Sequence, residues 1–125
     1  LLRFAAPELV GAAEAKLRGE PVDPAIFTRA VAGLRDQPGG EAIDTVVLAC
    51  THFPLVAEEL ARAFGAGVRF VDGAAGIARR IAYLTKGQAF ARSRPDRALF
   101  TRDAPDLAAL DPVLHRYGLG ERGVL

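Results

Sequence analysis

The sequence contains a single cysteine and no methionine among its 125 residues. With Cys50 alone, no disulfide bond can form within the chain, which excludes a fold stabilised by internal disulfides and fits a reducing compartment. The first residue is Leu1, whereas a complete translation product ordinarily begins with methionine. We therefore expect this chain to be a fragment of a longer protein.

The sequence also lacks an excess of either charge and any long apolar run. Lys and Arg number 16 and Asp and Glu number 15, so the formal net charge is +1. This balance gives no indication of a nucleic acid, a membrane surface or a polyanion as partner. No stretch approaches the roughly 20 apolar residues that span a bilayer, and the first residues do not read as a secretory signal. The composition is that of one modest globular domain.

Short runs of aliphatic and β-branched residues alternate along the chain with segments of helical periodicity, which predicts an α/β fold. Pro105 and Pro112 should divide the last helical segment into short pieces, and Gly118 and Gly120 mark its end. We predict helices over residues 7–18, 23–34, 53–64, 73–84 and 103–117, and strands over residues 44–50, 68–71 and 97–101.

Residues 44–50 show no clean alternation of polar and apolar side chains. This pattern is typical of a strand that is buried on both faces in a parallel sheet. Cys50, Thr51 and His52 lie at its carboxyl end, which is where parallel sheets bind ligands. The next predicted helix begins immediately afterwards, and the free N–H groups at a helix start favour an anion such as a carboxylate.

These three side chains could carry thiol chemistry. A thiolate is both a strong nucleophile and a usable base, an imidazole can relay protons, and a threonine hydroxyl can donate a hydrogen bond to a carboxylate oxygen. A cysteine at a strand end is, however, more often a small buried apolar residue than a catalyst. The residues by themselves leave both interpretations open.

The segment Val-Leu-Ala-Cys-Thr-His-Phe-Pro-Leu, residues 47–55, resembles the second cysteine motif of the glutamate racemases. Residues 5–14, 71–79 and 98–103 resemble other segments of that family in the expected order. The resemblance implies an α/β fold with two parallel-sheet lobes of the aspartate/glutamate racemase type, here incomplete. Residues 1–72 would be the part of the second lobe with the Cys-Thr-His motif, and residues 73–125 would return to the first lobe.

The resemblance also implies an activity, the interconversion of L- and D-glutamate without a cofactor or a metal. One thiolate removes the α-proton and a second thiol returns a proton to the opposite face of the substrate. Cys50 corresponds to the thiol that acts on the L-enantiomer. Thr51 and His52 are expected to bind the substrate, and His52 and Glu14 to assist proton handling around Cys50.

The rest of the family pattern is missing from this chain. It contains neither the first cysteine motif, a Cys followed by Asn-Thr on an earlier strand, nor the Asp-Ser pair near the family's amino terminus, nor the Tyr-Gly segment that the family carries between these two. We therefore expect the chain alone to be inactive. The parent enzyme is expected in the bacterial cytoplasm, where it would supply D-glutamate for peptidoglycan, and the resemblance is compatible with a homodimer.

Three alternatives remain at this point. The first is a sister racemase for aspartate or a hydantoin, which pairs two cysteines on the same fold. The second is a binding module that keeps the fold without the chemistry. The third is a thiol-dependent hydrolase with Cys50 as nucleophile and His52 as base, although residues two apart in a turn need not face each other.

Overall fold

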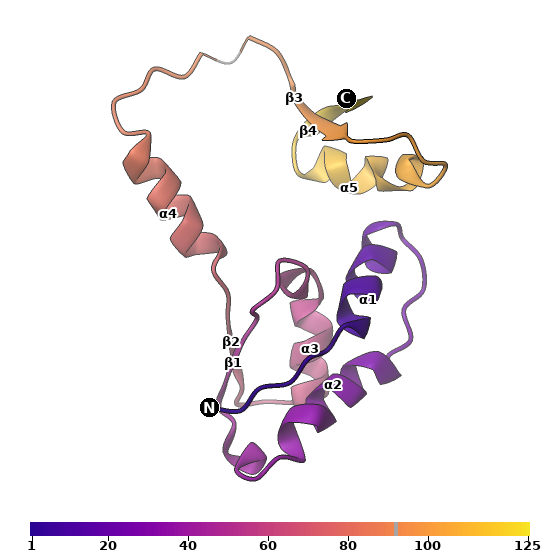
Figure 1. Ribbon diagram of the computed structural model, residues 1–125, viewed down its shortest axis with the longest axis vertical. Helices are drawn as coiled ribbons and strands as arrows, with labels where there is room; N and C mark the ends of the chain where they lie inside the picture. The colour runs from indigo at the N-terminus through magenta and orange to yellow at the C-terminus, as the bar shows by residue number, and fades with distance from the viewer. Residues whose placement is uncertain (92) are drawn as a thin grey trace.

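The computed structural model describes residues 1–91 and 93–125. Three α-helices and a two-stranded sheet form the amino-terminal part, and a fourth helix leads to a second two-stranded sheet with its own helix (Figure 1). The elements, with η for a 3-10 helix, are α1 (Glu8–Leu17), α2 (Ala25–Arg35), η1 (Gly40–Ala42), β1 (Thr45–Val47), η2 (Phe53–Val56), α3 (Ala57–Phe64), β2 (Arg69–Val71), α4 (Ala74–Leu84), β3 (Asp96–Phe100), η3 (Leu107–Leu110), α5 (Asp111–Arg116) and β4 (Leu119–Val124).

The first sheet pairs β1 with β2 in parallel, with Val46 opposite Phe70. The Leu48 N–H donates to the Val71 carbonyl at 2.8 Å and so continues the pairing beyond the end of β1. Helix α3 provides the crossover that parallel neighbours require. The predicted parallel α/β arrangement is therefore confirmed, although regular strand pairing covers fewer residues than the predicted strand over residues 44–50.

The core of the amino-terminal part lies where α1, α2 and α3 meet one face of this sheet. Its buried side chains come from all three helices, from η2 and from the residue that follows β1, and burial of each large one stabilises the fold by about 1.5–3 kcal/mol. The cluster comprises Leu9, Ala12, Ala13, Phe27, Ala30, Leu48, Val56 and Leu60, with Val46 and Phe70 packed against it.

Burial of the first strand on both faces was predicted, and this is wrong for the described chain. Val47 is 63% exposed and Val71 is 44% exposed, while their neighbours Val46 and Phe70 pack against the core. Side chains alternate between the two faces of a strand, and the core helices cover only one of them. The aliphatic run therefore has one face in the core and one apolar face open.

Helix α4 is amphipathic and exposed along its whole length. It extends away from the helices of the core (Figure 1). Ile77, Ile81 and Leu84 recur at helical spacing and are more than half exposed. The helix thus carries an apolar stripe of the kind that ordinarily packs against another element.

The second sheet contains a strand that the sequence did not predict. Strands β3 and β4 pair in parallel with a register shift between Asp96 and Arg97, and η3 and α5 form their crossover. Gly118, with φ of +78°, does end α5 as predicted, but the chain then extends immediately into β4. Because four of the six residues of β4 are glycine or charged, its sequence has little β-propensity, and its pairing with β3 defines it.

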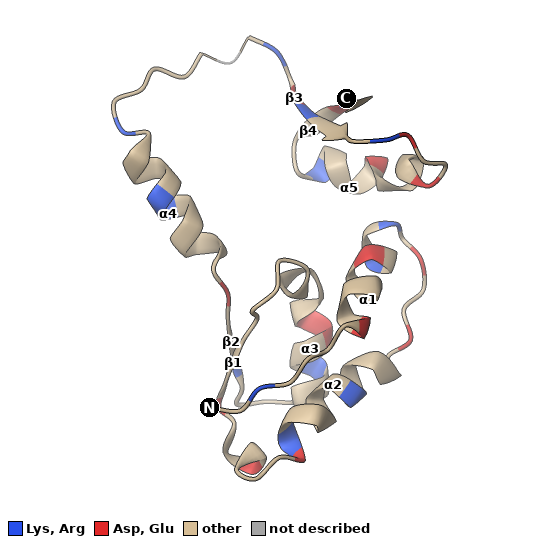
Figure 2. Cartoon of the chain, viewed as in Figure 1, with Lys and Arg blue, Asp and Glu red and all other residues tan. Residues whose placement is uncertain are grey.

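Acidic and basic side chains are interspersed over α1, α2 and α3 (Figure 2). Within the described residues, no helix has the length and apolar character needed to cross a membrane.

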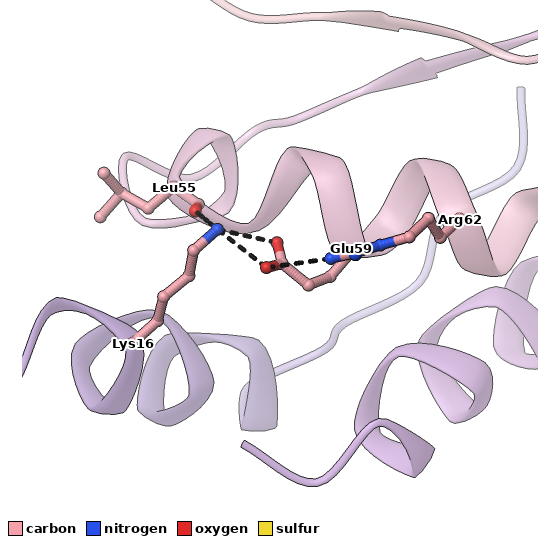
Figure 3. Close-up of polar contacts among 4 residues, drawn as sticks. All are labelled: Lys16, Leu55, Glu59 and Arg62. Atoms are coloured by element: carbon pink, nitrogen blue, oxygen red, sulfur yellow. Dashed lines mark hydrogen bonds and ion pairs between the residues drawn. The ribbon is translucent and has the colours of Figure 1, made fainter. Parts of the chain in front are cut away.

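A lysine joins α1 to the segment that follows β1 (Figure 3). Lys16 Nζ donates to the Leu55 carbonyl at 2.9 Å and to Glu59 Oε2 at 2.9 Å. Arg62 Nη2 lies 3.3 Å from Glu59 Oε1, so the carboxylate is shared by two cations. Burial by itself would raise the pKa of Glu59, but the hydrogen bond from Lys16 and the nearby positive charges outweigh it and lower that pKa below its ordinary value.

Truncation of the core should be costly. Leu60 is 3% exposed, and we expect Leu60→Ala to lower the free energy of unfolding by about 2–5 kcal/mol, because it loses apolar burial and leaves a cavity. Urea titration followed by circular dichroism measures this loss. Leu84→Ala on the exposed α4 is the matched control and should change stability by less than about 0.5 kcal/mol. Equal losses in both variants would contradict this placement of the core.

Removal of the Lys16 ammonium should produce a pH-dependent loss of stability. A carboxyl group with a lowered pKa stabilises the folded state above its ordinary value, here 4.5, and this contribution is lost as the pH falls below it. We expect Lys16→Met to cost about 1 kcal/mol at pH 7, discounted for the partial exposure of the lysine.

The cost of Lys16→Met should shrink on acidification below about pH 4.5. Parallel denaturation curves across this range provide the measurement. Lys86→Met, which replaces the other lysine of the chain, is the control. If the difference in the free energy of unfolding between Lys16→Met and wild type were independent of pH, the stabilisation by Lys16 would not arise from its ion pair with Glu59.

Candidate functional site

Cys50 lies in a turn three residues after the end of β1. The Phe53 N–H donates to the Cys50 carbonyl at 3.2 Å, and the Leu55 N–H donates to the His52 carbonyl at 3.0 Å. His52 is the N-cap of η2, and Pro54 fits the first turn of that helix because it needs no hydrogen-bond donor there. The motif therefore occupies the carboxyl edge of the parallel sheet, as predicted.

The helix after the motif differs from the prediction. Residues 53–64 were predicted as one helix, but they form η2 and then α3, which begins at Ala57. Val56, with φ of −117° and ψ of 21°, interrupts the helical geometry between them. The positive end of α3 consequently lies about one turn further from Cys50 than the sequence suggested, so the electrostatic contribution of that helix end to the thiol is reduced.

The thiol and the imidazole face each other within this turn. Cys50 Sγ lies 3.9 Å from His52 Nδ1, at the long end of hydrogen-bond distance for sulfur, and both side chains are partly buried. Two residues apart in an extended strand would share one face, whereas here the turn itself brings the two groups together. Residues two apart in a turn need not face each other, but in this structure these two do.

Helix α1 adds a carboxylate on the far side of the imidazole. His52 Nε2 lies 3.6 Å from Glu14 Oε1, so the two ring nitrogens of His52 face the thiol and the carboxylate. The structure thus brings together Cys50, His52 and Glu14, which are separated by up to 38 positions in the sequence. Thr51 lies between Cys50 and His52 in the same turn and is exposed.

This arrangement can move a proton in two directions. A neutral imidazole accepts a proton on one nitrogen while it donates from the other, so it can connect a thiol to a carboxylate. The Glu14 carboxylate is placed to orient the ring through Nε2. By geometry alone, the same pair also suits a thiol nucleophile with its base. The choice between a proton-transfer site and a nucleophilic site therefore needs information from outside the local geometry.

Two features of the surroundings have no clear signal in the sequence. Lys16 ties η2 to α1 and so fixes the segment after His52 against the helix that carries Glu14. Arg18 lies one helical turn beyond Glu14, with Nη1 at 3.8 Å from Glu14 Oε2. The spacing from Glu14 to Arg18 is that of an ordinary exposed ion pair on a helix, so the sequence alone does not distinguish it from such a pair.

Comparison with known proteins gives a consistent result. The chain is 59% identical over 125 residues to a glutamate racemase of Sphingopyxis alaskensis, an alignment that covers 96% of this chain and 45% of that protein. It is 47% identical over 114 residues to a glutamate racemase of Klebsiella pneumoniae, covering 89% of this chain and 39% of that protein. No protein-family model matches the chain. The chain thus spans somewhat less than half the length of these curated relatives.

The fold agrees with the sequence comparison. A crystal structure of Escherichia coli glutamate racemase in complex with L-glutamate and the activator UDP-MurNAc-Ala matches with a TM-score of 0.83 and 39% identity, over 95% of this chain and 45% of that one. A glutamate racemase from Bacillus anthracis shares the fold at a TM-score of 0.65 and 21% identity. In sequence and in fold, this chain is similar to the glutamate racemases, and it spans a little under one half of the length of these relatives.

Proposed function

We propose that the longer protein to which this chain corresponds is a glutamate racemase that interconverts L- and D-glutamate without a cofactor. One observation carries the proposal. The chain that is 59% identical to a named glutamate racemase places a thiol, an imidazole and a carboxylate in succession at the carboxyl end of a parallel strand. Proton transfer by Cys50 is the chemistry that this observation supports.

The proposed reaction is proton removal and return on opposite faces of the α-carbon. The Cys50 thiolate takes the α-proton of L-glutamate, so a C–H bond breaks, an S–H bond forms and the electron pair remains on carbon. A second thiol, contributed by residues outside this chain, then donates a proton to the other face. In the reverse direction Cys50 is the donor, and a thiol serves both roles because it ionises near neutral pH.

The residues around Cys50 receive supporting roles in this proposal. His52 lies between the thiol and Glu14 and carries the proton between them. Glu14 orients the imidazole and balances its charge. Thr51, exposed in the same turn, donates a hydrogen bond to a substrate carboxylate. Stabilisation of the carbanion falls to such donors, because no cofactor is proposed to accept the electrons.

The relatives support the proposed substrate. The similar Escherichia coli structure is a complex with L-glutamate, which supports glutamate over aspartate or a hydantoin. We propose that the enzyme supplies D-glutamate for peptidoglycan in the bacterial cytoplasm and that it can form a homodimer.

The lobe assignment is also part of the proposal, with residues 1–72 in one lobe and residues 73–125 returning to the other. Two exposed apolar surfaces support it. One is the open face of the first sheet, with Val47 and Val71, and the other is the stripe of α4 with Ile77 and Ile81. Apolar faces of this kind ordinarily pack against further structure, and the relatives contain more than half of their length outside the region matched here.

Replacement of Cys50 tests the catalytic role. In the longer protein, Cys50→Ser should lower the racemisation rate by about 10²–10⁴-fold, because a serine hydroxyl stays protonated near neutral pH and supplies almost no anionic base, unlike a thiol. Circular dichroism of the glutamate solution follows racemisation, and calorimetry follows glutamate binding, which should persist. Unchanged turnover in Cys50→Ser would instead identify a protein in which this thiol has no catalytic role.

The chain by itself should not catalyse the reaction. Incubated with L-glutamate in heavy water, the 125-residue chain should leave α-proton exchange at the rate of buffer alone, because most of the residues expected to bind the substrate, as well as the second thiol, lie outside it. Proton NMR of the glutamate α-position measures the exchange. Exchange clearly above that background would show that Cys50 and its neighbours suffice to bind glutamate and remove its α-proton, and would contradict the proposed inactivity of the chain alone.

A further inference from the structure

Arg18 connects the proposed proton relay to a second carboxylate. Arg18 Nε donates to Glu20 Oε1 at 2.9 Å, and Arg18 Nη1 lies 3.8 Å from Glu14 Oε2. The other oxygen of Glu14, Oε1, is the one that lies 3.6 Å from His52 Nε2. The two oxygens of Glu14 therefore face different partners, the guanidinium on one side and the imidazole on the other.

The environment of Arg18 differs from that of an ordinary surface pair. Its side chain is 22% exposed. By contrast, the side chain of Arg29 in α2, which pairs with Glu8 of α1, is 54% exposed. Glu20 accepts from Arg18 Nε, while Glu14 lies near Nη1, and Asp106 adds a further negative charge nearby. The hydrogen bond to Glu20 chiefly raises the pKa of Arg18, so the group keeps its charge.

We infer that Arg18 is a positioning residue for the thiol, acting through Glu14 and His52. This inference rests on the proposed function only in assigning Cys50 a proton-transfer role. Arg18 holds Glu14 Oε2 and leaves Oε1 directed at His52. The Glu14 side chain is 47% exposed, so without this partner it can rotate into solvent, and the imidazole then loses its carboxylate.

The consequence should be visible at the sulfur atom. A carboxylate held at Nε2 favours the imidazolium, and an imidazolium beside sulfur favours the thiolate. The charged groups around this relay are Glu14 and Arg18 on α1 and its end, Glu20 after it, and Asp106 from the carboxy-terminal part. Among them, Arg18 is the cation, and its loss should reduce the thiolate fraction at neutral pH.

The test measures alkylation of Cys50 by iodoacetamide as a function of pH in the longer protein. The tryptic peptide of residues 36–62 contains Cys50 and neither Arg18 nor Arg29, so mass spectrometry reads one thiol in every variant. We expect Arg18→Gln to slow alkylation at pH 7 by about three- to tenfold and to move the half-maximal rate to higher pH. At high pH, where the thiol is fully ionised, the variant and wild type should be alkylated at the same rate.

Further variants separate positioning from a merely structural role. Arg29→Gln removes an arginine from an exposed pair near the same helix and should leave the profile unchanged. Arg18→Lys keeps the positive charge and should retain most of the wild-type rate of Cys50 alkylation at pH 7. A variant that had lost structure would expose Cys50 and raise the plateau at high pH, which is opposite to the expected effect.

The two proposals fail in different ways. An Arg18→Gln profile equal to that of Arg29→Gln overturns the positioning role, even where Glu14→Gln still slows alkylation and the enzyme still racemises glutamate. Unaltered profiles in both Glu14→Gln and His52→Gln overturn the whole relay, including Arg18. A shifted Arg18→Gln profile in a protein without racemase activity supports the positioning role and contradicts the proposed function.

A double variant tests the route of the effect. Since Arg18 acts through Glu14, alkylation of Cys50 in the variant that combines Arg18→Gln with Glu14→Gln should be no slower than in Glu14→Gln alone.

Discussion

The close contact of α1 with η2 is the constraint on which the arrangement of the site depends. Ala12 and Ala13 of α1 are buried, Val56 of η2 is fully buried, and the Lys16 ammonium closes this contact through the Leu55 carbonyl. Small side chains allow a helix to approach its neighbour closely. The same helix carries Glu14 toward His52, so the packing of an alanine surface determines a distance between two titratable groups.

The geometry of the site therefore combines one local and one long-range contact. Cys50 and His52 are brought together by a turn of a few residues, which can form as soon as η2 forms. Glu14 reaches His52 only after α1 has packed against η2, and the separation of the two in sequence makes that contact dependent on the core. A destabilised core would consequently leave the thiol–imidazole pair in place while separating it from its carboxylate.

Sequence reasoning recovered the parts of this structure that have local signatures. Parallel strands, the position of Cys50 at a strand end and most helix bounds follow from periodicity and turn residues, and the comparison with the glutamate racemases confirms the fold. Glu14 was found only through resemblance, because a helical glutamate looks the same whether it faces solvent or an imidazole. Lys16 and Arg18 were missed for the same reason, since their partners lie in other segments or among ordinary helix pairs.

The errors also have physical causes. Strand β4 consists largely of glycine and charged residues, so its extended form depends on β3, which a local pattern cannot report. The double-sided burial of β1 was inferred from an aliphatic run, and that inference assumes that both faces are covered within the same chain. Val47 and Val71 show that the assumption does not hold for the described residues. The aliphatic pattern indicates that the strand is to be buried, but it does not indicate which residues pack against each of its faces.

This distinction bears on the chemistry as well as on the fold. A proton transfer from carbon without a cofactor needs groups that are already oriented, because reorientation during the reaction would add to its barrier. In this chain the orientation is built up in steps, from the alanine contact of α1, to the carboxylate of Glu14, to the ring of His52 and finally to sulfur. Each step fixes the next, yet His52 remains 36% exposed. This combination of a fixed orientation and a partly exposed imidazole fits the proposed reaction, in which the substrate and a second thiol come from outside the described residues.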